Sequence, residues 1–402
     1  ADNNENKVLN VPPLRFPEFS GEWEKCKFGD IATGFDYGMN AAAKPFDGEN
    51  KYIRITDIDE ASSTYNDTDI VSPDGSLTDN YVVNDRDILL ARTGASTGKS
   101  YLYRKSDGKL YYAGFLIRAN VTEHNPYFVF SQLHTHRYWR WVSIMSARSG
   151  QPGINSQEYS SFPIFTTSLH EENKIASLLS RLDERIATQN KIIEDLKKLK
   201  SAIVEMLLCN RNSELLKLGD IGYFVRGLTY ANEDVTENKA ATAVIRANNL
   251  NYGNHVDKGE VVYVSRTPAT SQILQKGDIV ICMANGSSAL VGKNSYYPFN
   301  DGQSTVGAFC GIYRTSHPLA KWLMQSRRYK RLVYQSLQGG NGAIANLNGD
   351  DILNMSFPVM EKEKSKSIIF ILETIEKSLA VNKGLQRSYS TQKSHLLKQM
   401  FI

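Results

Sequence analysis

The feature that most constrains the fold is an internal repeat, because the two halves of this 402-residue chain are similar to each other. Five pairs of segments, separated by between 190 and 195 positions, carry the similarity: KFGDIATGFDYG and KLGDIGYFVRG, YIRITDID and VIRANNLN, DRDILLARTGAS and KGDIVICMANGSS, HRYWRWVS and RRYKRLVY, and SFPIF and SFPVM. Self-similarity at one period indicates a tandem duplication, in which both copies form the same kind of unit. We therefore predict two similar domains.

Each half follows the same order of expected elements. Short runs rich in β-branched and aromatic residues predict strands, and in the first half these are YIRIT, DILLA, KSYLYR and YYAGFLIR. A basic and aromatic stretch then predicts a short helix, YFVFSQLHTHRYWRWVSI in the first half and PLAKWLMQSRRYKRLVYQSL in the second. A Gly- and Asn-rich loop and a Phe-Pro strand follow, and each half ends in a long helical segment without proline.

Heptad spacing is the strongest local signal in the two long helical segments. The apolar residues are Ile175, Leu179, Leu182, Ile186, Ile193, Leu196, Ile203 and Leu207 in the first, and Ile368, Leu372, Ile375, Leu379, Tyr389, Leu396 and Met400 in the second. This a/d pattern predicts a coiled-coil seam, and two ordinary amphipathic core helices are the alternative. Gln189 and Asn382 interrupt the two seams at equivalent places, so we predict that they fix the register.

The connectivity predicts the architecture. The first long helix reaches the second domain through a short link, so the second helix buries its seam most simply by running back along the first. We predict an α+β fold in which two tandem α/β domains, related by a pseudo-two-fold axis, are separated by a long antiparallel two-helix coiled coil about 50 Å long. The expected boundaries are residues 1–170 and 211–360 for the domains, and 171–210 and 361–402 for the helices.

Charge is distributed unevenly along the chain, although the net charge is only +4. Residues 91–150 hold nine Lys or Arg against two acids, giving 9 − 2 = +7, and residues 281–340 hold seven against one, giving 7 − 1 = +6. Residues 46–87 hold three basic residues against eleven acids, giving 3 − 11 = −8. Two basic blocks at repeated positions indicate two surfaces that face a polyanion, and an ordinary solvated surface is the alternative.

Several other functions lack their sequence signatures. The four cysteines are far apart and the seven histidines are scattered, which disfavours a metal site or a disulfide framework and is typical of a reducing cytoplasm. No apolar run reaches the length of a membrane-spanning helix, and the first ten residues do not resemble a signal peptide, so we expect a cytoplasmic protein that binds no membrane.

The segment GASTGKS, which ends at Ser100, resembles a phosphate-binding loop and raises the alternative of a nucleotide-binding enzyme. That motif needs a glycine five positions before Gly98, where this chain has Thr93. It also needs a helix after Lys99 and Ser100, whereas the following residues, YLYRKSDGKLYYAGF, have a strand-like pattern. The second half has a longer spacing at the equivalent place, which a phosphate-binding loop would not tolerate, so we predict a hairpin here and not a nucleotide pocket.

The sequence resembles the specificity subunits of type I restriction–modification enzymes over nearly the whole chain. The resemblance rests on LRFPEFSGEWEKCKFGDIA, the two GDI starts, the DILLARTGASTGKSYLY hairpin, and the FPI and FPV strands that lead into helices such as EENKIASLLSRLDERI. It implies a non-catalytic subunit with two target-recognition domains, each reading one half of a bipartite asymmetric DNA site. The two helices would set the spacer and dock two modification subunits.

The same resemblance implies which partners supply the chemistry. Double-stranded DNA, two modification subunits with methyltransferase activity, and restriction subunits with endonuclease and translocase activity are the expected partners. S-adenosylmethionine, ATP and Mg²⁺ would bind only to those subunits, so we expect no cofactor on this chain. The residues agree, since Asn125-Pro126-Tyr127-Phe128 lacks the second proline of an adenine methyltransferase motif and no G-x-G-x-x-G is present.

DNA contacts are expected from the hairpin, the Gly-rich loop and the basic helix of each half, because Arg and Lys reach phosphates and base edges while Asn and Gln suit adenine. In the first half the expected residues are Arg92, Thr93, Ser96, Lys99, Tyr101, Arg137, Arg140, Arg148, Gln151 and Asn155. In the second half they are Asn285, Ser287, Ser288, Lys293, Asn294, Arg327, Arg328, Lys330, Arg331, Asn341, Asn346 and Asn348. A coiled-coil scaffold with carbohydrate- or protein-binding domains is a further alternative.

Overall fold

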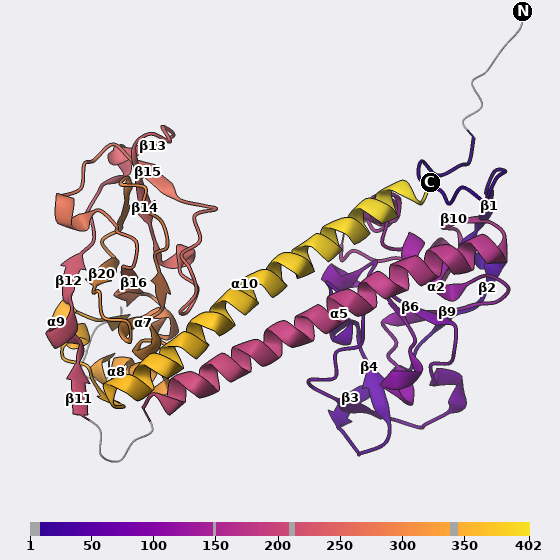
Figure 1. Ribbon diagram of the computed structural model, residues 1–402. Coiled ribbons are helices and arrows are strands. Elements are labelled where there is room, and N and C mark those ends of the chain that lie inside the picture. Colours follow the sequence, from indigo (N-terminus) through magenta and orange to yellow (C-terminus); the bar gives the residue numbers. More distant parts are fainter. Residues whose placement is uncertain (1–8, 148–149, 209–213, 338–344) are drawn as a thin grey trace, which may run out of the picture. The chain divides into compact units, whose positions relative to one another are not determined.

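The protein has a mixed α/β fold made of two compact units (Figure 1). The computed structural model describes residues 9–147, 150–208, 214–337 and 345–402. Unit 1 comprises Ala1–Asn190 and Gly384–Ile402, and unit 2 comprises Lys191–Lys383. The last part of the chain therefore belongs to the unit formed by the first part.

Unit 1 is built around a four-stranded antiparallel sheet with the strand order β2-β9-β6-β7. Its strands are β2 (Ala32–Tyr37), β9 (Leu116–Val121), β6 (Asp87–Ala91) and β7 (Ser100–Leu102). Three strand pairs accompany it: β1 (Glu24–Lys27) with β10 (Pro163–Thr166), β3 (Ala42–Pro45) with β5 (Val71–Asp74), and, in parallel, β4 (Lys51–Ile53) with β8 (Leu110–Tyr112). β6 is buried along its whole length, which explains its continuous apolar run.

Three of the four short α-helices of unit 1 begin at polar residues whose side chains cap them. The four helices are α1 (Phe28–Ile31), α2 (Pro126–Gln132), α3 (His136–Met145) and α4 (Ser156–Ser160). The side chains of Asn125, Thr135 and Asn155 accept hydrogen bonds from the first-turn amides of α2, α3 and α4. The single basic and aromatic helix predicted from the sequence is therefore wrong in one respect, because Thr135 starts a second helix within it.

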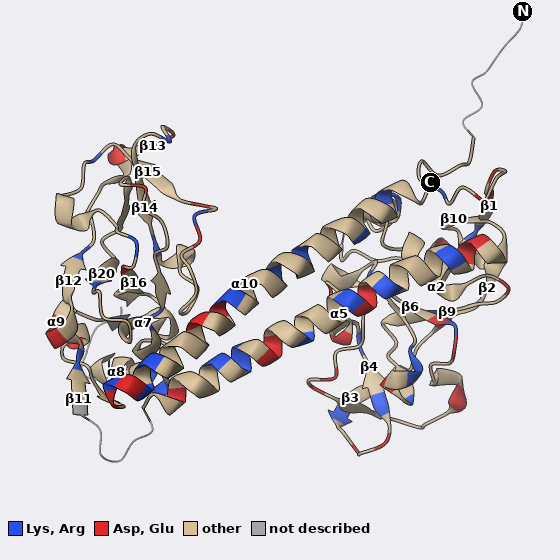
Figure 2. Cartoon of the chain, in the orientation of Figure 1, with Lys and Arg blue, Asp and Glu red and all other residues tan. Residues whose placement is uncertain are grey.

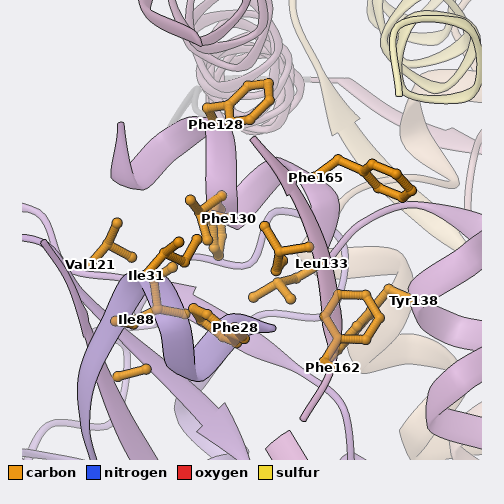
Figure 3. Close-up of a cluster of buried hydrophobic side chains, with 14 of the residues drawn as sticks. Phe28, Ile31, Ile88, Val121, Phe128, Phe130, Leu133, Tyr138, Phe162 and Phe165 are labelled. Carbon is orange, nitrogen blue, oxygen red and sulfur yellow. The ribbon is translucent and has the colours of Figure 1, made fainter. Parts of the chain in front are cut away.

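The core of unit 1 joins the sheet to α2, α3 and the Phe-Pro strand β10 (Figure 3). Ile88 and Val121 of the sheet pack with Phe128 and Leu133 of the α2 segment and with Phe162, which precedes β10. Met400 and Phe401, which follow the last helix of the chain, are also buried in this cluster. The C-terminal residues thus help to form the core of unit 1.

Unit 2 has the same strand connectivity in its principal sheet, with the order β12-β20-β16-β18. These strands are β12 (Tyr223–Arg226), β20 (Cys310–Arg314), β16 (Ile279–Cys282) and β18 (Asn294–Tyr296). A second sheet contains β13 (Val235–Thr236), β15 (Val262–Val264), β14 (Thr242–Ile245) and β19 (Ser304–Val306). Two strand pairs complete the unit: β11 (Glu214–Lys217) with β22 (Ser356–Val359), and β17 (Ala284–Asn285) with β21 (Ala345–Asn346). The short helices are α6 (Leu218–Ile221), α7 (Ala320–Leu323), α8 (Arg327–Leu337) and α9 (Gly349–Leu353).

Two helices of 38 residues each, α5 (Leu169–Met206) and α10 (Lys362–Gln399), contribute to both units. In unit 1, Asp183 of α5 pairs with Lys393 of α10 at 2.6 Å, and Arg185 lies over the ring of Tyr389. From the first contact to the second, the residue number rises on α5, from 183 to 185, and falls on α10, from 393 to 389. The two segments therefore run antiparallel in unit 1. In unit 2 the residues Ile193, Leu196, Ile203, Ile375 and Leu379, all from the predicted seam, form one apolar cluster.

Candidate nucleic-acid interface

The hairpin between β6 and β7 carries the first group of predicted DNA-binding residues. Its turn depends on Gly94 and Gly98, whose φ angles of +68° and +92° lie in the region that only glycine adopts without strain. Gly98 is packed so closely against α3 that a Cβ there would lie 2.8 Å from Val142 Cγ1. The hairpin is thus held against α3, which carries the exposed Arg140.

The geometry of this turn does not support the nucleotide-binding alternative. A phosphate loop presents free backbone N–H groups at the start of a helix. Here the amides of Thr97, Gly98 and Lys99 donate to the carbonyls of Gly94, Ala91 and Ser96, and the chain continues as strand β7. Lys99 Nζ lies 3.2 Å from Glu60 Oε2 at the surface.

The Gly-rich loop pairs with the hairpin and brings the two predicted groups together in unit 1. Thr93 forms a β-bridge with Gly153, and the amide of Gly94 donates to Pro152 O at 2.9 Å. Gln151 is exposed next to this bridge, while Asn155 caps α4. Hairpin and loop therefore form one surface, and Arg148 lies outside the described residues.

Unit 2 has an equivalent surface. The short pair β17–β21 joins Ala284 to Asn346 and Asn285 to Ala345, in the place of the Thr93–Gly153 bridge of unit 1. Exposed side chains on the hairpin, the loop and α8 include Ser287, Ser288, Arg327, Lys330, Arg331, Asn346 and Asn348, and Figure 2 shows Lys and Arg along α8. Asn348 also caps α9. Asn341 lies outside the described residues.

Two cavities border the surface of unit 2. The larger, about 1170 Å³, is lined by residues of the predicted set, Ser288, Lys330 and Asn346, together with Lys197 and Lys200 of α5. Tyr252 lies in the same cavity, and the ammonium groups of Lys293 and Lys330 lie 5.6 and 5.7 Å from its ring centre. The smaller cavity, about 710 Å³, is lined by Asn285, Arg246, Asn248 and Phe309, among others.

The structure buries two of the predicted residues and half-buries a third. Tyr101 is fully buried and its hydroxyl donates to Asp107 Oδ2 at 2.6 Å, so it is a core residue of unit 1. Asn294 is 5% exposed and donates to Met324 O. Arg137 lies over the ring of Phe165 at 4.6 Å, and burial lowers its pKa to about 10. Tyr101 and Asn294 therefore stabilise the surface from within and are not presented to a ligand, while Arg137 is half-buried against an aromatic ring.

The sequence did not identify several residues that the structure places on these surfaces. Phe115 and Phe309 are 56% and 68% exposed, because each stands in a turn directly before β9 or β20. The run YYAGFLIR was predicted as one strand and is in fact two, β8 and β9, with Phe115 in the turn between them. Arg246 and Asn248 are exposed and line the smaller cavity. They belong to the repeat segment VIRANNLN, but nothing in the sequence distinguished them as functional residues.

The two basic residues Lys200 and Lys321 share one carboxylate in unit 2. Glu376 Oε1 lies 2.9 Å from Lys200 Nζ, and Glu376 Oε2 lies 2.7 Å from Lys321 Nζ. Burial by itself would raise the pKa of Glu376, but the charge of Lys200 and the hydrogen bond from Lys321 outweigh it and lower the pKa below 4.5. The network fixes α7 against α5 and α10 inside unit 2.

Other kinds of site were not found in the described part of the chain. Among residues 9–147, 150–208, 214–337 and 345–402, no group of three or more His, Cys, Asp or Glu could hold a metal ion. Within these same ranges no helix is both long and apolar enough to span a membrane.

The fold and the surface together define a class of α/β protein. Its two units share one sheet connectivity, and each unit has a surface of hairpin and loop that is rich in Arg, Lys, Asn and Ser. Within that class, residues 20–198 match the family model of the type I restriction modification DNA specificity domain. For these residues the match confirms the resemblance that the sequence motifs indicated.

Two curated proteins are similar to part of the chain. These are the specificity subunit of the type I restriction enzyme EcoKI of Escherichia coli and that of StySPI of Salmonella potsdam, both 29% identical over 150 residues. The alignment covers 35% of this chain and 31% of each relative, so the chain spans about a third of the length of the curated relatives it matches.

Solved structures share the fold over nearly the whole chain. A type I restriction–modification S subunit from M. genitalium has a TM-score of 0.64 and 16% identity, with 98% of this chain and 99% of that chain covered. A structure described as showing complex assembly and conformational transition of a type I restriction–modification system has a TM-score of 0.52 and 14% identity, with 97% and 98% covered. At this identity the likeness is one of fold.

Proposed function

We propose that this chain is the DNA specificity subunit of a type I restriction–modification complex. In this role each unit is a target-recognition domain that reads one half of a bipartite asymmetric site. The observation that carries the proposal is the recurrence, in both units, of a hairpin bridged to a polar loop beside a basic helix. DNA is the polyanion that two such surfaces suit best, because Asn, Arg and Lys side chains contact base edges and phosphates.

The proposed DNA-binding set consists of the predicted residues that are exposed or half-buried, without Arg137, whose guanidinium packs on Phe165. In unit 1 it keeps Arg92, Thr93, Ser96, Lys99, Arg140 and Gln151, together with Asn155 at the head of α4. In unit 2 it keeps Asn285, Ser287, Ser288, Lys293, Arg327, Arg328, Lys330, Arg331, Asn346 and Asn348. The exposed residues Phe115, Arg246, Asn248 and Phe309 join it, because they lie on or beside the same surfaces.

In this proposal α5 and α10 form an antiparallel coiled coil that sets the spacer between half-sites, with the target-recognition domains related by a pseudo-two-fold axis. Packing of the predicted seam residues in unit 2 supports the coiled coil. Gln189 and Asn382 would fix its register. Modification subunits would dock on the outer face of the helices, where Phe370, Ile371 and Leu199 of unit 2 are 71%, 45% and 49% exposed.

The chain itself would be non-catalytic and act in the cytoplasm. Methyltransferase activity with S-adenosylmethionine would belong to the modification subunits, and ATP-driven, Mg²⁺-dependent cleavage to the restriction subunits. The supporting observations are the family match of residues 20–198, the fold of the S subunit relatives, and a turn at Gly98 whose amides are already hydrogen-bonded.

Binding of the full chain to a labelled duplex at increasing salt tests this function. Because several Lys and Arg would displace counterions from phosphates, the logarithm of the affinity should fall linearly with the logarithm of the salt concentration, with a slope of several units. ATP added to the same chain should show no saturable micromolar binding. A flat salt dependence would favour the scaffold alternative, and saturable ATP binding would favour the nucleotide-binding enzyme.

A further inference from the structure

Arg92 of unit 1 lies against two exposed aromatic rings. Its guanidinium carbon lies 4.8 Å from the ring centre of Tyr37 and 5.9 Å from that of Phe115. The two rings are 42% and 56% exposed, so neither belongs to the core. An arginine flanked by aromatic rings gains cation–π attraction and loses part of the rotamer freedom of its long side chain.

The main chain around Arg92 is fixed from two sides. Its amide donates to Phe115 O at 3.0 Å, and its carbonyl accepts from the amide of Ile154 at 3.0 Å. The Nε of Arg92 donates to Gly114 O at 3.1 Å, which sets the plane of the guanidinium. Tyr37 is anchored as well, because its hydroxyl accepts from the backbone amide of Ser156 at 3.2 Å.

The outer end of the guanidinium is left open by this arrangement. In the part of the chain that the structure describes, Nη1 and Nη2 of Arg92 form no hydrogen bond and no ion pair with a carboxylate, whereas Arg54 and Arg118 of the same unit pair with Asp57 and Asp36. An arginine that is oriented through Nε and free at both terminal nitrogens presents two parallel donors. Guanine offers the matching pair of acceptors, O6 and N7, at its major-groove edge.

We propose that Arg92 reads a guanine in the half-site bound by unit 1, and that Tyr37 and Phe115 are positioning residues that hold its guanidinium in the reading orientation. This inference rests on the proposed function and adds a base identity and three residue roles to it. A side chain that is already ordered loses little freedom on binding, so more of the interaction energy remains for discrimination between bases.

Unit 2 has the same backbone arrangement with a different residue. The amide of Met283 donates to Phe309 O at 2.8 Å and its carbonyl accepts from Leu347 at 2.7 Å, which are the bonds that Arg92 forms with Phe115 and Ile154. Met283 is 6% exposed, and its thioether cannot donate to a base. The guanine contact is therefore specific to unit 1, and methionine is a residue that this backbone position accepts.

Selection of bound sequences from a random duplex library, with the full chain, tests the inference. Wild type should enrich a bipartite motif in which one column of one half-site is guanine. Arg92→Met should reduce the preference for guanine in that column alone, by about 5- to 150-fold, because a bidentate contact is lost. Lys99→Met is the matched control on the same hairpin, and it should weaken binding of all sequences and leave the motif unchanged.

Variants of the positioning residues separate orientation from simple packing. Phe115→Ala and Tyr37→Leu should lower selectivity in the same column, whereas Phe115→Tyr and Tyr37→Phe, which keep the rings, should retain it. If wild type enriches a bipartite motif and Arg92→Met leaves every column unchanged, this inference is overturned and the proposed function stands. If wild type enriches no bipartite motif, both are overturned.

Discussion

Phe401→Ala should destabilise unit 1 and leave unit 2 nearly unchanged. Phe401 follows α10, is 5% exposed, and packs against Trp23 and Phe128 with ring centres 6.1 and 5.4 Å away. Removing a buried phenylalanine costs about 3–5 kcal/mol, and the two aromatic contacts account for about 1–3 kcal/mol of it. The residue stands just beyond a helix end where neighbours can relax, so we expect a loss of about 3 kcal/mol.

Native-state hydrogen exchange of the full chain measures this loss separately in each unit. The free energy of opening of the amides in β6 and β9 should fall by about 3 kcal/mol, while amides in β16 and β20 should change by less than about 0.5 kcal/mol. Phe370→Ala is the matched control, since Phe370 is on α10 and 71% exposed. An equal loss in both units, or a Phe401→Ala effect no larger than that of Phe370→Ala, would refute the reasoning.

Three further predictions concern other parts of the chain. The pKa of Glu376 is lowered in the folded state, so its ion pairs with Lys200 and Lys321 stabilise unit 2 above pH 4.5, and this stabilisation is lost as the pH falls below that value. In urea unfolding, Glu376→Gln should therefore lose less stability than wild type between pH 7 and acid pH. Gly98→Ala should cost at least about 1–3 kcal/mol, from strain at φ +92° and a clash with Val142, whereas Gly286→Ala, with no atom within 4 Å, should be neutral in thermal unfolding. Lys99→Gln should reduce the salt slope of duplex binding by about 1, and an unchanged slope would remove Lys99 from the phosphate-contact set.

The regular parts of this fold are the parts that the sequence could predict. A heptad pattern states which face of a helix is buried, and the seam residues Ile193, Ile375 and Leu379 do pack together in unit 2. The β6–β7 hairpin was predictable for a similar reason, since the apolar run of β6 ends at a glycine-containing turn and β7 follows. In these elements local pattern and tertiary packing agree.

The surface was harder to predict, because residue type does not determine exposure. Tyr101 and Asn294 have side chains suited to DNA, but each lies on the inner face of a strand where its polar atom bonds inside the unit. The exposure of Phe115 was not predictable, because an apolar residue within a strand-like run is expected to be buried. In the structure, the chain turns between β8 and β9, and this turn exposes the Phe115 side chain. Strand pairing between distant segments decides such breaks, and a local pattern contains no information on that pairing.

Methylome sequencing of cells that carry this chain with type I modification and restriction subunits tests the central claim most directly. If each unit reads one half-site, methylated adenines should occur at one bipartite motif with a spacer of constant length. Exchange of unit 2 residues at the hairpin and loop, such as Asn285 and Asn346, should alter one half of that motif and leave the other intact. A continuous motif, or methylation at random sequences, would contradict the account.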